Sequence, residues 1–91
     1  MAITVHLPSL LARHAAGVRT HLVGGTTVAE AITNLTRDFP ELDRRISEAT
    51  AAETQFVLVY LNDEDVRHRG GWAAPLQDGD EISLVSAIAG G

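Results

Sequence analysis

The stretch PLQDGDEISLVSAIAGG, residues 75–91, combines a tight turn, a strand and a terminal pair of glycines. Its Asp-Gly pair supplies the positive φ that a tight turn needs. Residues 81–88 then read as a strand, in which the polar Ser83 stands between the apolar Ile82 and Leu84. Since Ser83 marks the outward side, we expect Ile82 and Leu84 to face a core.

The two final glycines have no side chain that could supply chemistry. If this end is functional, the reactive group is therefore the α-carboxylate of Gly91. Backbone without a Cβ passes through channels that other residues cannot enter, so a narrow active site in another protein could admit this end. The alternative interpretation is a frayed terminus of small residues.

Upstream of this stretch, the sequence predicts a central strand and one main helix. Residues 56–61, FVLVYL, are continuously apolar and rich in β-branched and aromatic side chains, which indicates a strand with both faces covered or used. Thr27 and Glu30 form a capping box, and apolar residues then recur at helical spacing until Pro40. The helix is therefore expected to follow Thr27 and to end before Pro40.

The remaining segments complete one small fold. Residues 3–7 and 18–23 read as a β-hairpin, residues 42–46 as a short helical turn, residues 47–54 as a polar loop and residues 66–67 as a short edge strand. The order ββαββ predicts an α+β, β-grasp (ubiquitin-like) fold, with a mixed sheet packed on one main helix and a free C-terminal Gly-Gly tail. We expect a single domain over residues 1–91, with residues 88–91 as a flexible tail.

Composition excludes several classes of function. The 91 residues contain no cysteine, so disulfides, thiolate metal sites and a cysteine nucleophile are excluded. A net charge of −5 argues against nucleic acid as a partner. No apolar run approaches the roughly 20 residues of a membrane span, and the first residues lack the basic region of a signal peptide, so we expect a cytoplasmic protein without membrane contact. The four histidines are scattered singly, and no metal site is expected.

Two short motifs at a fixed spacing carry a family resemblance. They are the turn Leu76-Gln77-Asp78-Gly79-Asp80-Glu81 and the final Gly90-Gly91, and an upstream strand ends in Asn62. With them, essentially the whole chain resembles the MoaD/ThiS family of ubiquitin-like sulfur carriers. Residues 59–67, VYLNDEDVR, and 87–91, AIAGG, are most similar to the branch of this family that serves cysteine biosynthesis.

The resemblance implies a protein co-substrate and not an enzyme. Gly91 would be adenylated by ATP in a ubiquitin-activating-type adenylyltransferase and sulfurtransferase, and then converted to a thiocarboxylate, while Ala89 and Gly90 thread the partner's channel. The chain itself would bind no cofactor, because ATP and zinc belong to the activating partner. A PLP-dependent cysteine synthase would accept the sulfur, and a metalloprotease would trim the carrier.

The resemblance also implies a partner-binding face. Val57, Val59 and Leu61 would share the core with the inward side chains of the last strand. An exposed apolar patch would then lie beside the root of the tail, and such patches usually mark partner surfaces. Its members are Phe56, Leu58, Tyr60 and Val85. The alternative places Phe56 over the sheet edge, under residues 47–54.

Other functions stay open on the sequence. Within the family, the chain could be the small subunit of a molybdopterin synthase, or a sulfur carrier for thiamine or another metabolite. In a different class, it could be a ubiquitin-like interaction or conjugation module. All seven basic residues are arginines, so the chain offers no ordinary acceptor for isopeptide linkage to its own kind apart from its N-terminal amine.

Overall fold

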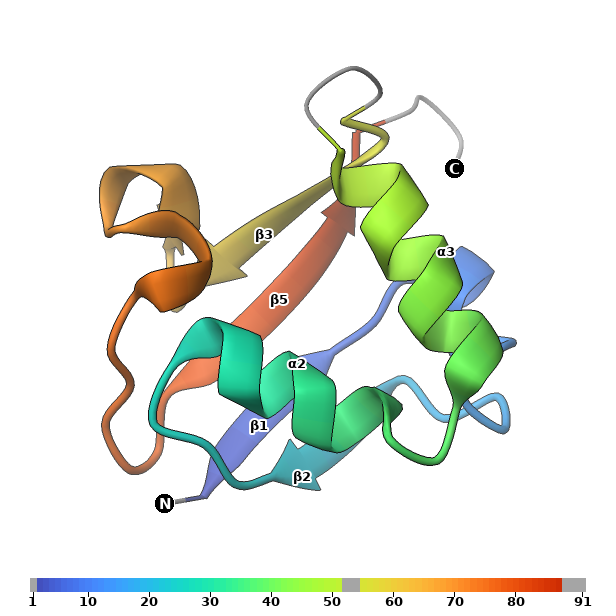
Figure 1. The fold of residues 1–91 in the computed structure, drawn as a ribbon, viewed down its shortest axis with the longest axis horizontal. Coiled ribbons are helices and arrows are strands. Elements are labelled where there is room, and N and C mark those ends of the chain that lie inside the picture. Colours follow the sequence, from blue (N-terminus) through green and yellow to red (C-terminus); the bar gives the residue numbers. More distant parts are fainter. Residues whose placement is uncertain (1, 52–54, 88–91) are drawn as a thin grey trace.

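The structure, a computed structural model, describes residues 2–51 and 55–87. A five-stranded sheet in the order β2-β1-β5-β3-β4 forms its centre (Figure 1). β1 and β5 are parallel, and the other neighbouring strands are antiparallel, so the sheet is mixed as expected. The strands are β1 (Ile3–His6), β2 (Thr20–Val23), β3 (Val57–Leu61), β4 (Glu64–Asp65) and β5 (Glu81–Ser86).

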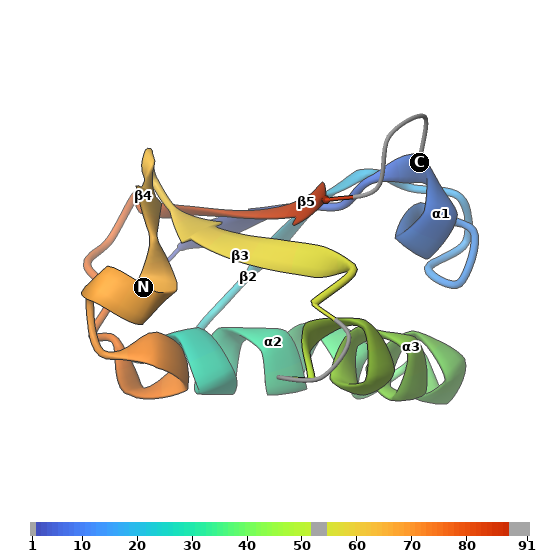
Figure 2. The ribbon, with the colours of Figure 1, turned by 90° about the horizontal axis from the view of Figure 1, so that it is seen from above.

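The two longer helices, α2 (Val28–Thr36) and α3 (Pro40–Thr50), cover one face of this sheet (Figure 2). The hydrophobic core fills the space between the sheet and these helices, and the inward side chains of the two central strands are all buried in it. They are Val57, Val59, Leu61, Ile82 and Leu84. The expected α+β architecture and the expected inward faces of β3 and β5 are thus confirmed.

The capping box predicted from the sequence starts α2. The side-chain oxygen of Thr27 accepts a hydrogen bond from the Glu30 amide at 3.1 Å. The Glu30 carboxylate in turn accepts from the amide of Thr26 at 2.9 Å. Both bonds satisfy amides in and before the first turn of the helix, which has no earlier carbonyls to pair with.

Residues 42–46 are helical as predicted, but the helix was predicted too short and the loop over residues 47–54 was wrong up to Thr50, because α3 runs from Pro40 to Thr50. Pro40 stands at the start of the helix, where its missing amide costs nothing. Leu42 and Ile46 lie one turn apart and are both buried. The chain therefore has two main helices on the sheet and not one.

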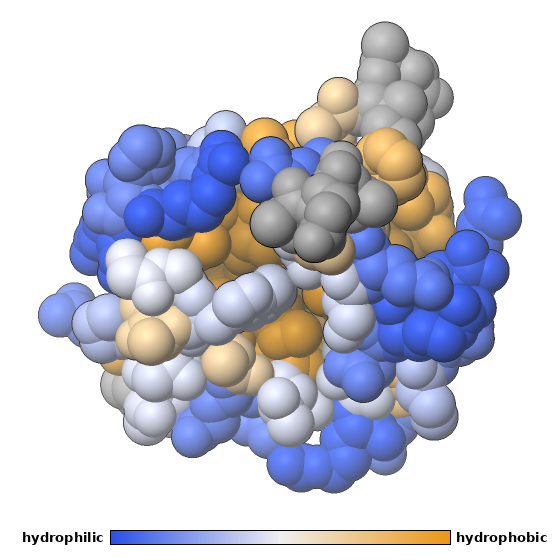
Figure 3. Space-filling view, turned by 45° about the horizontal axis from the view of Figure 1, so that its top comes forward, coloured by the Kyte–Doolittle hydropathy of each residue, from blue (hydrophilic) through white to orange (hydrophobic). Residues whose placement is uncertain are grey.

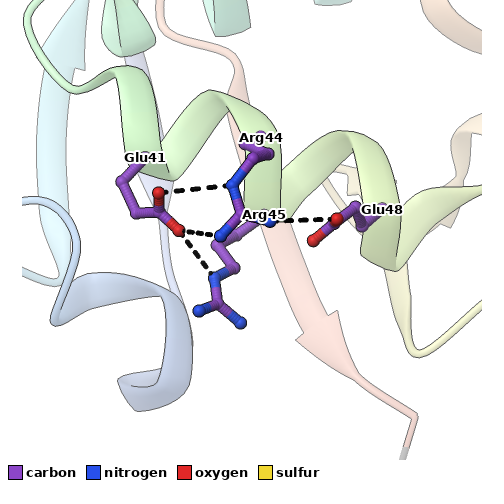
Figure 4. A network of polar contacts seen from close by, with 4 residues as sticks. All are labelled: Glu41, Arg44, Arg45 and Glu48. Carbon is purple, nitrogen blue, oxygen red and sulfur yellow. Dashed lines mark hydrogen bonds and ion pairs between the residues drawn. The ribbon is translucent and has the colours of Figure 1, made fainter.

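Ion pairs support the exposed side of α3, as Figure 4 shows. Arg44 bonds Glu41 on one side and Glu48 at 3.0 Å on the other, while Arg45 bonds Glu41 at 3.0 Å. Pairs at this spacing support a helix modestly, because the charges are exposed to solvent. The polar composition that suggested a loop is thus the solvent face of a helix.

Two further expectations need correction. The connection between β1 and β2 is not a plain hairpin, because it contains the helical turn α1 (Ser9–Ala12), and β2 begins at Thr20 instead of residue 18. The short edge strand is β4, which lies two residues earlier in the sequence than the predicted residues 66–67. Those residues belong instead to the 3-10 helix η1 (Val66–His68), which is followed by a second one, η2 (Gly71–Ala73).

Gly25 allows the chain before α2 to pass close to that helix, because it has no Cβ. A Cβ at this position would lie 2.8 Å from the backbone nitrogen and 2.9 Å from the Cα of Ala31. We predict that Gly25→Ala lowers the free energy of unfolding by roughly 1–3 kcal/mol, because backbone has to move to relieve the overlap. Urea unfolding followed by circular dichroism measures the loss. Removing the Ala31 side chain should not restore stability, since the clash is with backbone; unchanged stability of Gly25→Ala would contradict the contact.

Candidate functional site

The start of β5 is fixed by side chains of the two turns beside it. Asn62 adopts the left-handed conformation, with φ of 56°, and its amide donates to the carbonyl of Glu81 at 2.7 Å. Its side-chain oxygen accepts from the Glu81 amide at 3.1 Å, and its side-chain nitrogen donates to Asp80 at 3.3 Å. Asn62 thus joins the end of β3 to the first residue of β5.

The turn before β5 is also stabilised by hydrogen bonds between its own residues. The Asp80 carboxylate accepts from the amide of Gln77 at 2.9 Å, and Gly79 has the positive φ, 89°, that the Asp-Gly pair predicts. Asp78 reaches further, because its carboxylate accepts from the amide of Ala2 at 2.7 Å. The turn before β5 is therefore tied to the beginning of β1 as well as to the end of β3.

At its other end, β5 is held until the last described residue. The amide of Ala87 donates to the carbonyl of Phe56 at 2.9 Å, which continues the pairing of β3 with β5. Chain leaving the sheet here starts from a backbone position that is fixed by hydrogen bonding. The predicted tail, residues 88–91, and its predicted functional residues Ala89, Gly90 and Gly91 lie outside the described residues.

The structure brings the four residues of the predicted patch together on the sheet face that the helices leave free. Leu58 lies directly opposite Val85 in the pairing of β3 with β5, and Tyr60 lies opposite Ser83. Phe56 and Val85 are 50% and 44% exposed, whereas Leu58 and Tyr60 are half-buried. We call Phe56, Leu58, Tyr60 and Val85 the outer patch. Its use as a partner surface stays a prediction.

A polar strip borders the outer patch on the same face. His6 on β1 lies beside Ser83 and bonds Glu81 at 2.6 Å through its Nε2. Asn62 and Asp63 line the shallow hollow next to this pair. In the described ranges 2–51 and 55–87, no three His, Asp or Glu side chains converge as metal ligands would. None of the helices in this part of the chain combines the length and apolar character of a membrane span.

An ion pair that sequence reasoning missed lies at the β4 side of the outer patch. Asp65 is opposite Tyr60, and its carboxylate accepts two bonds at 3.1 Å from Nε of Arg67 and one at 2.7 Å from Nη2. It also accepts from the Arg67 amide at 2.9 Å, which caps η1. The Arg67 side chain and then its amide lower the pKa of Asp65 to about 2. The signal was an aspartate two residues before an arginine, the spacing of a capped turn.

Comparisons with known proteins match most or all of the chain to one family. The sequence model of the ThiS family matches residues 12–91. The sulfur carrier protein CysO of Mycobacterium bovis is 33% identical over 93 aligned residues, which cover 100% of both chains. The protein of the same name from Mycobacterium tuberculosis is equally similar.

Solved structures agree with the sequence comparison. A chain from the crystal structure of the BexX/CysO complex of Amycolatopsis orientalis is 36% identical with a TM-score of 0.84, covering 99% of this chain and 100% of that one. The crystal structure of Mycobacterium tuberculosis CysO has 31% identity and a TM-score of 0.82, over 94% and 99% of the two chains. The small archaeal modifier protein 1 of Methanosarcina acetivorans has 25% identity and a TM-score of 0.80, over 99% and 96%.

The Asp65–Arg67 pair predicts a pH dependence. Because folding lowers the pKa of Asp65, the stability that the pair contributes is present above the pKa of the unfolded chain, roughly 3.9, and is lost as the pH falls through about 2. In Arg67→Gln we expect the pKa of Asp65 to rise toward its usual range and the loss of stability in acid to become shallower. Carboxyl carbon NMR titration of both proteins measures the first effect, and thermal unfolding between pH 5 and pH 2 the second. If the pKa of Asp65 in the variant equalled that in the wild type, Arg67 would not be the cause of the lowered pKa.

Proposed function

The chain belongs to the ThiS family, and on this premise we propose that it is a sulfur carrier whose last residue in this sequence, Gly91, bears the sulfur as a thiocarboxylate for cysteine biosynthesis. The observation that carries the proposal is the similarity to CysO over the full length of both chains. The Gly-Gly end and the turn before β5 lie within the residues matched by the family model.

The chemistry requires activation of the terminal carboxyl. Such a group has a pKa of roughly 3.3–3.7, so at neutral pH it is an anion that resists attack by a sulfur nucleophile. In the first step its oxygen attacks ATP held by the activating partner, which forms an acyl-adenylate and releases pyrophosphate. In the second step, sulfide-level sulfur displaces AMP and forms the carbon–sulfur bond. The thiocarboxylate sulfur is an anionic nucleophile at neutral pH, as sulfur donation requires.

In cysteine biosynthesis the sulfur would be accepted by an electrophilic alkene, which a PLP-dependent partner would supply by eliminating the activated hydroxyl group of a serine derivative. The thiocarboxylate sulfur adds to the alkene and gives a thioester on Gly91. The amino group of the attached cysteine unit then attacks the thioester carbonyl. A peptide bond replaces the thioester, and the cysteine thiol is freed. Hydrolysis of this peptide bond, by a trimming metalloprotease, releases cysteine and restores the carboxylate. ATP, zinc and PLP are all assigned to the partners and none to this chain.

The role of the described residues is to hold and present the tail. β5 is paired on both sides, and its turn is tied to Asn62 and Ala2, so the chain leaves a rigid body at Ala87. Delivery of a terminal atom into an active site depends on such positioning, since a misplacement of about 1 Å can cost on the order of 10²-fold in rate. The outer patch beside this exit supplies a surface on which both partners can dock.

A second function is favoured by one comparison. The similarity to a protein named as a small archaeal modifier favours the ubiquitin-like conjugation module that the sequence left open. In that case the carboxyl of Gly91 would end in an amide with a lysine of a target. The targets would have to be other proteins, because the seven basic residues of this chain are all arginines.

The state of the terminus tests the carrier proposal. After incubation with its activating enzyme, ATP and a sulfur donor, the intact protein should gain the mass of sulfur minus that of oxygen, and a fragment containing Gly91 should carry the change. A variant lacking Gly91, or one with an added alanine after it, should stay unmodified, because the reacting carbonyl moves by a whole residue. High-resolution mass spectrometry measures both results. An unmodified acid throughout would contradict the proposal, and amide-linked adducts with other proteins would favour the modifier function.

A charged side chain introduced into the outer patch tests whether partners dock there. Leu58→Arg should keep the fold and weaken binding of the activating enzyme by about 2 kcal/mol or more, since an arginine cannot fill the apolar contact of a hot spot. Leu22→Arg is the matched control, because Leu22 is 74% exposed on the edge strand β2, opposite Thr4 and remote from Val85. Calorimetric titration measures affinity, and circular dichroism checks folding. Wild-type affinity in a folded Leu58→Arg protein would exclude the patch as the docking surface.

A further inference from the structure

A hollow of about 150 Å³ lies at the edge of β3, beside the outer patch. Its walls come from the end of α3, from η1 and from η2, and Figure 3 shows apolar surface at the bottom of a hollow on this side of the molecule. The apolar lining includes Val57, Val59, Val66 and the half-exposed Trp72. The hollow is open on one side, and its volume is sufficient for a side-chain ring of the size of benzene.

β3 leaves part of this edge without a strand. β4 consists of two residues and lies opposite Tyr60 and Leu61 only. On the other side, the bonds from Ala87 to Phe56 and from Asn62 to Glu81 fix which peptide groups face β5. By the alternation of an antiparallel ladder, the amide and carbonyl of Val57 point away from β5, toward the hollow. An edge of this kind is a template for one more strand.

The charges at the rim of the hollow neutralise one another. Arg67 is bound by the carboxylate of Asp65, and Arg69 bonds Glu64 at 3.0 Å. Neither arginine is therefore an uncompensated charge that would attract an acidic side chain. Burying an unpaired charge in an apolar site is costly, so the complementary side chain is an uncharged one.

The hollow is also continuous with the outer patch. Leu58 belongs to the patch and takes part in the lining of the hollow, while Asp65 lies opposite Tyr60 and lines it as well. A partner that covers Leu58 from the open face of the sheet therefore reaches the edge of β3 within one strand width.

We propose that the edge of β3 binds an extended segment of a partner protein, which adds as a strand at Val57 and places one uncharged aliphatic or aromatic side chain in the hollow. The identification of that partner as an enzyme of the sulfur-carrier cycle rests on the proposed function. The strand edge and the hollow do not depend on it. Main-chain hydrogen bonds would supply affinity and the hollow would supply specificity, as in other cases of strand addition.

The test uses short capped peptides and the intact chain, with no enzyme. Nitrogen-15 NMR spectra are recorded while Ac-Ala-Val-Phe-Val-Ala-NH2 is added, and while the same peptide with Asp in place of Phe is added. The Phe peptide should shift the amide signals of Val57 and Val66 and the indole signal of Trp72 in a saturable way. The Asp peptide should bind about tenfold more weakly or worse, because its charge would be buried.

Two variants fill or open the hollow from different sides. Thr50→Phe places a ring into it from the end of α3, and Trp72→Ala removes part of its wall; both should weaken the Phe peptide at least several-fold while the spectrum stays that of a folded protein. Val18→Ala is the control, since Val18 is as exposed as Trp72 but takes no part in the lining. It should bind the peptide as the wild type does.

Three results would overturn the proposal. They are the absence of saturable shifts at the edge of β3, shifts confined to Phe56 and Val85, and equal binding of the Phe and Asp peptides. Shifts at Val57 that depend on protein concentration without peptide would show that a second copy of the chain occupies the edge instead. This titration does not require thiocarboxylate formation. A negative peptide result would therefore not contradict the carrier function, and a negative result for the carrier function would not affect the interpretation of the peptide titration.

Discussion

The pairing of β5 on both sides is the constraint on which the rest of the structure depends. β5 is parallel to β1, the first strand, and antiparallel to β3, so segments from both ends and the middle of the sequence meet along it. Its inward residues Ile82 and Leu84 are buried, and the helices close over them. Because the strand is held from Glu81 to Ala87, the point where the chain leaves the sheet is set by the whole core and not by a local loop.

On the proposed function, a carrier of this size would bind several partners through one surface. The helices already cover one face of the sheet, so the open face and its edges are what the described chain can offer to other proteins. Partners that docked on the outer patch would then bind one after another, and the chemical state of the terminus would be the feature that differs between them. A small patch with two half-buried members suits this use, because tight binding to one enzyme would delay transfer to the next.

Some of the fold follows directly from local sequence. The Thr27 capping box, the alternation around Ser83 and the Asp-Gly turn each act through neighbouring residues, and each was predicted and is present. The length of α3 was underestimated, because its stability comes from packing of Leu42 and Ile46 and from ion pairs on a side whose composition is that of a polar loop.

The same distinction applies to the candidate site. The members of the outer patch were identified because period-two alternation assigns faces, and the family resemblance chose which face was inward. The hollow at the edge of β3 could not be predicted, because its walls come from α3, β3 and the segment after β4, and no periodicity relates them. The terminal residues were identified by their chemistry and by the family resemblance, and they lie outside the described residues.

The arrangement of β5 also decides how the protein bears a load. A force applied at Ala87 along the axis of β5 acts parallel to its ladders with β1 and β3. The hydrogen bonds of both ladders are then loaded in shear, so many must break together, whereas a strand peeled from an edge loses its bonds one after another. A partner that pulled on the chain in this direction would therefore meet the resistance of both ladders together.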